Sequence, residues 1–202
     1  MTPYWQRLGF PFERLIPSLA TAIGNSSDRP AALAELMGLI LNGGQRRPTI
    51  QLEELRFAAG TPYHTVIRPS AQPATQVLPL PVARALRTVL AEVVKQGTAR
   101  RLAGAFTGPD GRSMTAGGKT GSGDNRFKSF GRGGGVVSSR AVNRTATFAF
   151  YIGDRYFGVV TASVLGKQAD SYTFTSALPV AILKLLAPAL NERLASQKRL
   201  PA

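Results

Sequence analysis

The sequence predicts an α/β protein of the α+β type, in which an antiparallel sheet is packed with helices. Three stretches, 113–122, 145–152 and 156–164, are the expected strands, the last two because they are rich in β-branched and aromatic residues. A Gly-Asp pair at 153–154 separates those two and favours a tight antiparallel turn. Apolar residues recur at helical spacing over 176–195, so this segment is expected to form a helix lying on the sheet.

Length, charge and cysteine content narrow the class of protein. The chain has 202 residues, 44% of them hydrophobic, which is enough for one domain with a core or a large part of a bigger domain. Its net charge of +14 favours an anionic partner, such as nucleic acid, acidic lipid headgroups or an acidic polymer. The lack of cysteine excludes disulfides and thiolate metal sites, and fits a periplasm or a cytoplasm equally well. The sequence has neither a signal-peptide run nor an apolar stretch long enough to span a membrane.

Two helices are expected before the first strand of the sheet. Pro30 suits the first turn of a helix that the Ser-Asp pair at 27–28 can cap, and the Asn-Gly-Gly run at 42–44 ends it. The second helix is expected to open at Pro81 and to end near Gly97. One apolar face of the first helix contains Leu33, Leu36, Met37, Ile40 and Leu41, and one face of the second contains Val82, Leu86, Val89, Leu90 and Val93.

The remaining segments carry weaker patterns. A short helix is expected to end at Gly9, and brief extended pieces are expected near 46–50 and 65–69. The glycine-rich, basic stretch 123–135 has little periodicity and is expected to be a loop. Pro188 is expected to bend the C-terminal helix, because proline removes a helical hydrogen bond and its ring crowds the preceding turn.

The Lys-Thr-Gly-Ser run at 119–122 is the candidate functional feature, and glycines at 117 and 118 precede it. Glycine inside a strand marks a place where something approaches the backbone closely. A phosphate-binding loop, G-x-x-x-x-G-K-[ST], would need glycine where Ser113 stands. It would also need a helix directly after the threonine, and the Gly-Ser-Gly run at 121–123 disfavours one. A nucleotide site of this type is therefore excluded.

Other chemistries find less support in the sequence. Phe106, Phe127 and Phe130 lie among arginines and lysines, a composition that suits single-stranded nucleic acid but arises more often from a solvated basic loop. His64 is the only histidine and lacks a ligand-spaced companion, so no metal and no cofactor is expected. Asp124 is expected to form a turn rather than touch a ligand. A nucleic-acid-binding module remains an alternative, but nucleic acid is not among the expected partners.

Several segments together resemble the class A, bifunctional penicillin-binding proteins. The run 17–24 looks like the segment that follows the middle motif of that family. The run 93–99 is similar to the family's V-x-x-G-T-A helix end, and 118–122 to its Lys-Thr-Gly motif. Order and spacing agree from about Leu8 to Leu186. The resemblance implies a partial penicillin-binding-protein/β-lactamase-like transpeptidase fold, with 1–202 as the C-terminal portion of that domain and without the glycosyltransferase domain.

The resemblance also implies a function and a role for each motif residue. It implies part of a peptidoglycan D,D-transpeptidase that cross-links stem peptides through a serine acyl-enzyme and binds penicillin and other β-lactams. Lys119 would support the proton network and the positive field of the site. The hydroxyls of Thr120 and Ser122 would contact the substrate carboxylate, with Gly121 between them in the binding strand. The backbone N–H of Ser122 would form half of the oxyanion hole.

The nucleophile of that family is missing from this sequence. No serine stands three residues before a lysine, so Ser-x-x-Lys is absent, and Ser-x-Asn is absent too. This chain alone is therefore expected to be inactive, and a non-catalytic relative is an alternative. Expected partners are stem peptides, β-lactams and the missing N-terminal part of the same domain. The parent protein is expected at the periplasmic face of the bacterial inner membrane, with the membrane contacted only through an absent anchor.

Two local departures follow from the same resemblance. The family usually has a second hydroxyl residue after the position of Ser122, and Gly123 stands there instead. The strand at 156–162 would pair in the family with strands encoded before the catalytic serine. It is therefore expected to be an edge strand in this chain.

Overall fold

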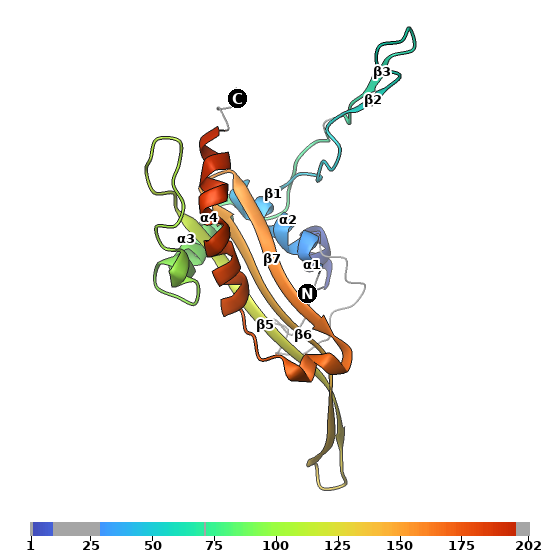
Figure 1. Ribbon diagram of the computed structural model, residues 1–202, viewed down its shortest axis with the longest axis vertical. Helices are drawn as coiled ribbons and strands as arrows, with labels where there is room; N and C mark the ends of the chain where they lie inside the picture. Colours follow the sequence, from blue (N-terminus) through green and yellow to red (C-terminus); the bar gives the residue numbers. More distant parts are fainter. Residues whose placement is uncertain (1, 10–28, 71, 197–202) are drawn as a thin grey trace.

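The computed structural model describes residues 2–9, 29–70 and 72–196 (Figure 1). In chain order the helices and strands are α1 Thr2–Arg7, α2 Pro30–Leu41, β1 Gln45–Arg46, β2 Leu55–Phe57, β3 Thr65–Ile67, β4 Thr75–Gln76, α3 Leu80–Lys95, β5 Ala116–Phe130, β6 Val136–Ile152, β7 Tyr156–Leu165 and α4 Ala177–Ser196. Short 3₁₀ helices, η2 Arg100–Leu102 and η3 Gly166–Ser171, precede β5 and α4. No helix in the described ranges has the length and hydropathy needed to cross a membrane.

The centre of the fold is an antiparallel sheet with the strand order β5-β6-β7. This arrangement confirms the predicted α+β class. Gly153 follows β6 with a φ of 60°, a value that glycine adopts without steric cost, and the chain turns here into β7. Within the described residues β7 pairs only with β6, so the prediction of an edge strand at 156–162 is confirmed.

The prediction that 123–135 forms a loop is wrong for most of that segment. β5 continues to Phe130 and β6 begins at Val136, so only the short turn between them is irregular. Polar pairs across the two strands hold this extension, including Asn125 Nδ2 donating to Asn143 Oδ1 at 2.7 Å. Register shifts after residues 125 and 129 mark bulges in the ladder. Polar pairs and bulges leave no apolar alternation in the sequence, which is why the pattern suggested a loop.

Helices cover both faces of the sheet, as Figure 1 shows for α2 and α4. Side chains of neighbouring strand residues point to opposite faces. Ala149 and Tyr151 pack with α2 residues Met37 and Ile40. The other face packs against α4 through a cluster that includes Phe148, Ile152, Val180 and Leu183. The expectation of a C-terminal helix lying on the sheet is confirmed, and α4 continues past Pro188 to Ser196.

The structure contains both helices predicted before the sheet, but the prediction of which side of α3 is buried is partly wrong. α2 begins at Pro30 and is followed by Gly43 and Gly44 with φ of 66° and 89°, as expected for a glycine stop. The proposed caps at 27–28, like the run 17–24, lie outside the described residues. α3 begins at Leu80, but its buried residues are Ala83, Leu90 and Val94, whereas the predicted face leaves Val82, Leu86 and Val89 exposed. Helical spacing in the sequence identifies an apolar stripe along the helix, but tertiary packing determines which side of that stripe is buried.

Outside the main sheet, the segment between α2 and α3 forms two small antiparallel pairs. β1 pairs with β4 close to the end of α2, and β2 pairs with β3 in a hairpin that extends from the rest of the chain (Figure 1). The extended pieces expected near 46–50 and 65–69 therefore exist, though the first is limited to Gln45–Arg46. The short N-terminal helix α1 ends before Gly9, whose φ is 95°.

Candidate functional site

The two glycines before the Lys-Thr-Gly-Ser run are packed against side chains of the neighbouring strand. A Cβ atom on Gly117 would lie 2.5 Å from the Tyr151 ring. A Cβ atom on Gly118 would lie 2.4 Å from the Ala149 carbonyl oxygen and 2.7 Å from the Phe148 ring. The sequence correctly predicts a close approach here, but the approaching groups belong to β6 and not to a ligand.

Lys119, Gly121 and Ser122 are the exposed members of the run, and only Thr120 is buried. Lys119 lies opposite Ala149, and its Nζ donates a hydrogen bond of 2.7 Å to the Thr120 carbonyl oxygen. An ammonium has three N–H donors, so this bond leaves it able to bind an anion. A Cβ atom on Gly121 would meet nothing within 4 Å, so open space adjoins the strand at this residue.

Thr120 is turned into the protein. Its side chain is only 8% exposed, and its Oγ1 lies 2.8 Å from Thr98 Oγ1. Thr98 stands in the tight turn after α3, where a Cβ atom on Gly97 would lie 2.8 Å from the Val93 backbone. The threonine pair therefore fixes the end of α3 against β5.

Ser122 is joined to the segment that leads into α4. Its Oγ accepts a hydrogen bond of 2.8 Å from the backbone N–H of Ser176. Together with the threonine pair, this bond holds the run 119–122 from both ends. The predicted site residues therefore lie along one strand, with Lys119, Gly121 and Ser122 exposed and the hydroxyls of Thr120 and Ser122 hydrogen-bonded within the protein.

A network of charged side chains lies directly beyond Ser122. Asp124 contacts Arg144 at 3.3 Å and Arg126 at 3.6 Å, and Arg126 also contacts Asp170 at 2.6 Å. The hydrogen bond to Asp170 raises the pKa of Arg126, so this guanidinium stays charged. Arg144 Nη1 donates to the Phe174 carbonyl oxygen at 3.5 Å. The prediction that Asp124 forms a turn is wrong, because this residue lies within β5 and binds cations on two strands.

The same network fixes the position of the segment 172–176. Arg144 reaches it through Phe174, and Ser122 reaches it through Ser176. Arg144 Nε is buried and lacks a hydrogen-bond partner among the described residues. A buried donor without a partner destabilises the fold, so the contacts of the Arg144 guanidinium with Asp124 and Phe174 must offset that cost.

Tyr151 anchors the opposite end of the strand pair. Its hydroxyl donates to the Arg87 carbonyl oxygen at 2.8 Å, and the Arg87 guanidinium lies 5.6 Å from the centre of its ring. Arg87 also pairs with Asp154, and that hydrogen bond raises the pKa of Arg87. Burial raises the pKa of Tyr151, so the phenol keeps its proton.

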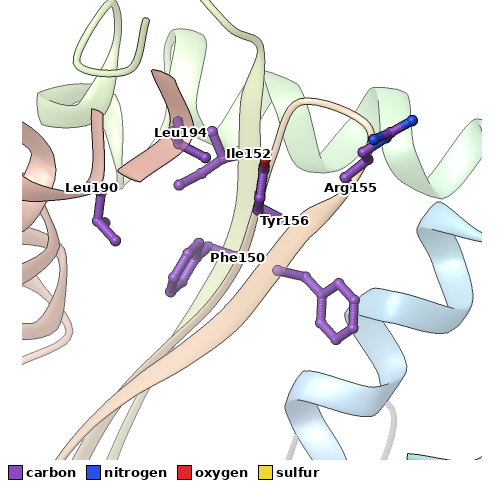
Figure 2. Close-up of a pocket in the computed structure, with 7 residues that line it drawn as sticks. Phe150, Ile152, Arg155, Tyr156, Leu190 and Leu194 are labelled. Carbon is purple, nitrogen blue, oxygen red and sulfur yellow. The ribbon is translucent and has the colours of Figure 1, made fainter. Parts of the chain in front are cut away.

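An apolar pocket lies away from the candidate site, between α4 and the β6–β7 turn (Figure 2). Its volume is about 290 Å³, and it is lined by Phe150, Ile152, Arg155, Tyr156, Phe157, Leu190 and Leu194. None of the residues at 119–122 lines it. It therefore does not extend the candidate site.

The alternative chemistries gain little from the structure. Phe106 is buried, whereas Phe127 and Phe130 are exposed, so only two of the three aromatics could stack on a base. His64 is exposed between β2 and β3. No group of three potential metal-ligating side chains occurs within 2–9, 29–70 and 72–196.

Three residues that hold the site were not assigned a role from the sequence. Thr98 lies in the run 93–99, which indicated a family resemblance but gave no contact for its threonine. Ser176 and Arg144 belong to no motif. Their contacts depend on how α4 and β6 return to β5, which no local pattern encodes.

Comparison with known proteins identifies the fold. No protein-family model and no curated protein matches this chain. Solved structures do match. Penicillin-binding protein 3 from Mycobacterium tuberculosis, complexed with aztreonam, is 19% identical with a TM-score of 0.59, over 99% of this chain and 47% of that one. Penicillin-binding protein 1A from Haemophilus influenzae is 20% identical with a TM-score of 0.61, over 98% of this chain and 31% of that one.

A peptidoglycan glycosyltransferase from Burkholderia ambifaria is 18% identical with a TM-score of 0.56, over all of this chain and 58% of that one. The chain thus spans about half, or less, of the length of the first two structures that it matches. At these identities the likeness concerns the fold alone. The chain has the transpeptidase-like fold found in penicillin-binding proteins.

Proposed function

We propose that residues 1–202 form the C-terminal portion of the transpeptidase domain of a class A penicillin-binding protein. In this proposal the parent protein is a peptidoglycan D,D-transpeptidase that cross-links stem peptides at the periplasmic face of the bacterial inner membrane. This chain supplies the Lys-Thr-Gly-Ser wall of the active site. The N-terminal part of the same domain supplies the nucleophilic serine and its base.

The observation that carries the proposal is that the run at 119–122 is anchored to the protein and still accessible to a ligand. It is anchored at Thr120 by Thr98 and at Ser122 by Ser176, and it leaves the Lys119 ammonium and the backbone at Gly121 accessible. A rigid strand with an exposed cation and open backbone suits binding of an extended peptide that ends in a carboxylate. The fold likeness to penicillin-binding proteins is consistent with this use.

The roles proposed for the residues at 119–122 follow from electrostatics. Attack by a serine on a peptide carbonyl creates negative charge on the carbonyl oxygen, and a preorganised N–H at Ser122 would stabilise that charge. The Lys119 ammonium would bind the substrate carboxylate and favour the deprotonated form of a neighbouring base. The hydroxyls of Thr120 and Ser122 already have protein partners, so each would have to share its hydrogen bond with the carboxylate.

Labelling with a fluorescent penicillin tests the proposal on the complete reading frame and on the 202-residue chain. The complete protein should be acylated on a serine outside 1–202, and the chain alone should remain unlabelled, because it lacks Ser-x-x-Lys. Lys119→Ala should slow acylation of the complete protein roughly 100-fold, the scale expected for loss of one electrostatic contact to the reacting group.

Lys128→Ala is the matched control, because Lys128 is an exposed lysine further along the same strand. Its labelling should equal that of the wild type. A penicillin adduct on a serine of the 202-residue chain would overturn the assignment of the nucleophile.

A non-catalytic relative is the second candidate, favoured by the absence of both Ser-x-x-Lys and Ser-x-Asn from these 202 residues. It predicts that the complete protein also remains unlabelled. Such a protein would keep the binding wall at 119–122 without the acylation step.

A further inference from the structure

β5 and β6 continue beyond the sheet as a two-stranded ribbon, which we call the arm and define as residues 126–140. Pairing between β6 and β7 begins at Asn143, so past this point the two strands have only each other. Figure 1 shows the arm projecting from the sheet at the end away from the C-terminal turns of α4. In the described part of the chain, η3 contacts β6 and meets the arm at Arg126 through Asp170, so bonds between the two strands must supply the rest of the stability of the arm.

Polar bonds stabilise the arm. Arg126 Nε donates to Ser139 Oγ at 2.8 Å, and the hydroxyls of Ser129 and Ser138 lie 2.6 Å apart. The large apolar side chains of the arm are therefore not needed to hold its two strands together and remain exposed. Phe127 and Phe130 are each 63% exposed and Val137 is 74% exposed, and Val136 beside the turn is exposed as well.

The arm is also strongly basic. It contains four cationic residues and no aspartate or glutamate. Arg126 is neutralised at the base of the arm by Asp124 and Asp170. Lys128, Arg132 and Arg140 are exposed, and no ion pair joins them to a carboxylate in the described part of the chain. Their charge is therefore available to an external anion.

We propose that the arm is a docking element for an anionic phospholipid surface. Lys128, Arg132 and Arg140 attract the headgroup phosphates, each adding an independent electrostatic contribution. The phenyl rings and valines enter the boundary between headgroups and acyl chains, where apolar side chains leave water. The turn at 131–135 is rich in glycine, so little side-chain bulk separates its backbone from the surface.

The combination of side chains favours a lipid surface over an anionic polymer. Nucleic acid would neutralise the cations and could stack on Phe127 and Phe130. It would offer nothing to Val136 and Val137, which would remain in water. A lipid interface accommodates both the charged and the aliphatic side chains of the arm.

Vesicle binding by the 202-residue chain tests the proposal. The probe is Phe130→Trp in a Trp5→Phe background, because Trp5 is the only native tryptophan. Addition of mixed phosphatidylcholine–phosphatidylglycerol vesicles should shift its emission to shorter wavelength, and pure phosphatidylcholine vesicles should not. Absence of a shift with the anionic vesicles would overturn the proposal.

Two triple variants separate a specific arm from general basicity. Lys128→Gln, Arg132→Gln and Arg140→Gln together should weaken binding to anionic vesicles roughly 100-fold, given the usual contribution of each cation near such a surface. Arg84→Gln, Lys184→Gln and Arg193→Gln remove the same charge from exposed positions on α3 and α4, and should change binding by no more than about threefold. Equal losses in the two variants would contradict a docking role for the arm.

Phe127→Ser with Phe130→Ser tests the apolar component in the otherwise native chain. These side chains are exposed, so circular dichroism should report an unchanged fold. Vesicle binding should fall about tenfold or more as apolar burial is lost. Unchanged vesicle affinity would overturn the insertion of the arm. Binding of a single-stranded oligonucleotide that depends on the arm, without vesicle binding, would assign the arm to a polyanion instead.

Discussion

Tyr151, near the end of the central strand β6, combines three contacts in one side chain. Its ring fills the space above Gly117, its hydroxyl bonds to the Arg87 carbonyl oxygen, and its face lies beneath the Arg87 guanidinium. Burial raises its pKa above the ordinary value of 10.0. The folded protein therefore holds the phenolic proton to higher pH than the unfolded chain does.

This difference predicts how stability depends on pH. The stabilisation is fully present below about pH 10, the ordinary pKa, and is lost as the pH rises through the higher folded-state pKa. At neutral pH, Tyr151→Phe should lower the free energy of unfolding by about 1 kcal/mol, through loss of one hydrogen bond. Phenylalanine does not titrate, so the difference in unfolding free energy between the wild type and Tyr151→Phe should become smaller above pH 10. Urea denaturation at several pH values measures this difference. A free-energy difference that stays constant with pH would contradict a raised pKa for Tyr151 in the folded protein.

Gly118 and Gly121 give a second prediction at the scale of single residues. Gly118→Ala places a methyl group 2.4 Å from the Ala149 carbonyl oxygen and should cost about 1–3 kcal/mol of unfolding free energy. Gly121→Ala is the matched control on the same strand, since nothing lies within 4 Å of the new atom. It should leave stability unchanged or raise it by up to about 1 kcal/mol. Urea midpoints that fall equally in both variants would refute the packing at Gly118.

The same residues indicate how far the candidate site could be read from sequence. The tetrapeptide identified the strand because glycines and a hydroxyl-rich run are local features. Sequence could not tell that Thr120 points inward to Thr98, since the two residues belong to different elements. It also could not say what approaches the backbone at 117 and 118, because β6 side chains cannot be aligned with β5 until the register is known.

At the scale of elements, Arg144 connects β6 to the segment that leads into α4. Its side chain is 19% exposed, and it pairs with Asp124 and bonds to the Phe174 carbonyl oxygen. Arg144→Met keeps much of the side-chain length but removes both bonds. Peptides covering 172–176 should then exchange amide hydrogens about tenfold faster or more, the scale of a lost charged hydrogen bond.

Arg140→Met is the matched control, because Arg140 lies on the same strand and is exposed. Exchange over 172–176 should be unaffected in this variant. If Arg144→Met also left that exchange unchanged, the guanidinium would have no part in positioning the segment.

Elements were predicted well where one local signal dominated. Proline at the start and glycines at the end fixed α2, and β-branched runs fixed the cores of β6 and β7. The outer halves of β5 and β6 were missed, because serine and asparagine pairs stabilise them in place of apolar alternation. The buried side of α3 was misjudged, because tertiary packing covers Ala83 and Val94 more fully than Val82, Leu86 and Val89.

At the scale of the whole molecule, β7 presents an open edge. It pairs only with β6 among the described residues, and 156–162 contains neither lysine nor proline. Exposed backbone donors and acceptors on such an edge favour pairing with another chain. The 202-residue chain should therefore self-associate, and its weight-average mass in sedimentation should rise with concentration.

Charges on the edge strand test this expectation. Thr161→Lys with Ser163→Lys should shift the chain toward monomer, since lysines discourage edge pairing. Gln51→Lys with Ser70→Lys adds the same charge at exposed positions away from the sheet and should leave association unchanged. A wild-type chain that stays monomeric at high concentration would contradict the prediction.

The unequal surroundings of Gly117 and Gly118 determine how this sheet can change by mutation over time. The three atoms nearest to a Cβ on Gly117 all belong to the Tyr151 side chain, so a smaller residue at 151 can make room for alanine at 117. The nearest atom to a Cβ on Gly118 is a backbone oxygen, which no substitution removes. Positions 117 and 151 are therefore free to covary among descendants of this sequence, whereas position 118 is confined to glycine whatever residue occupies 148.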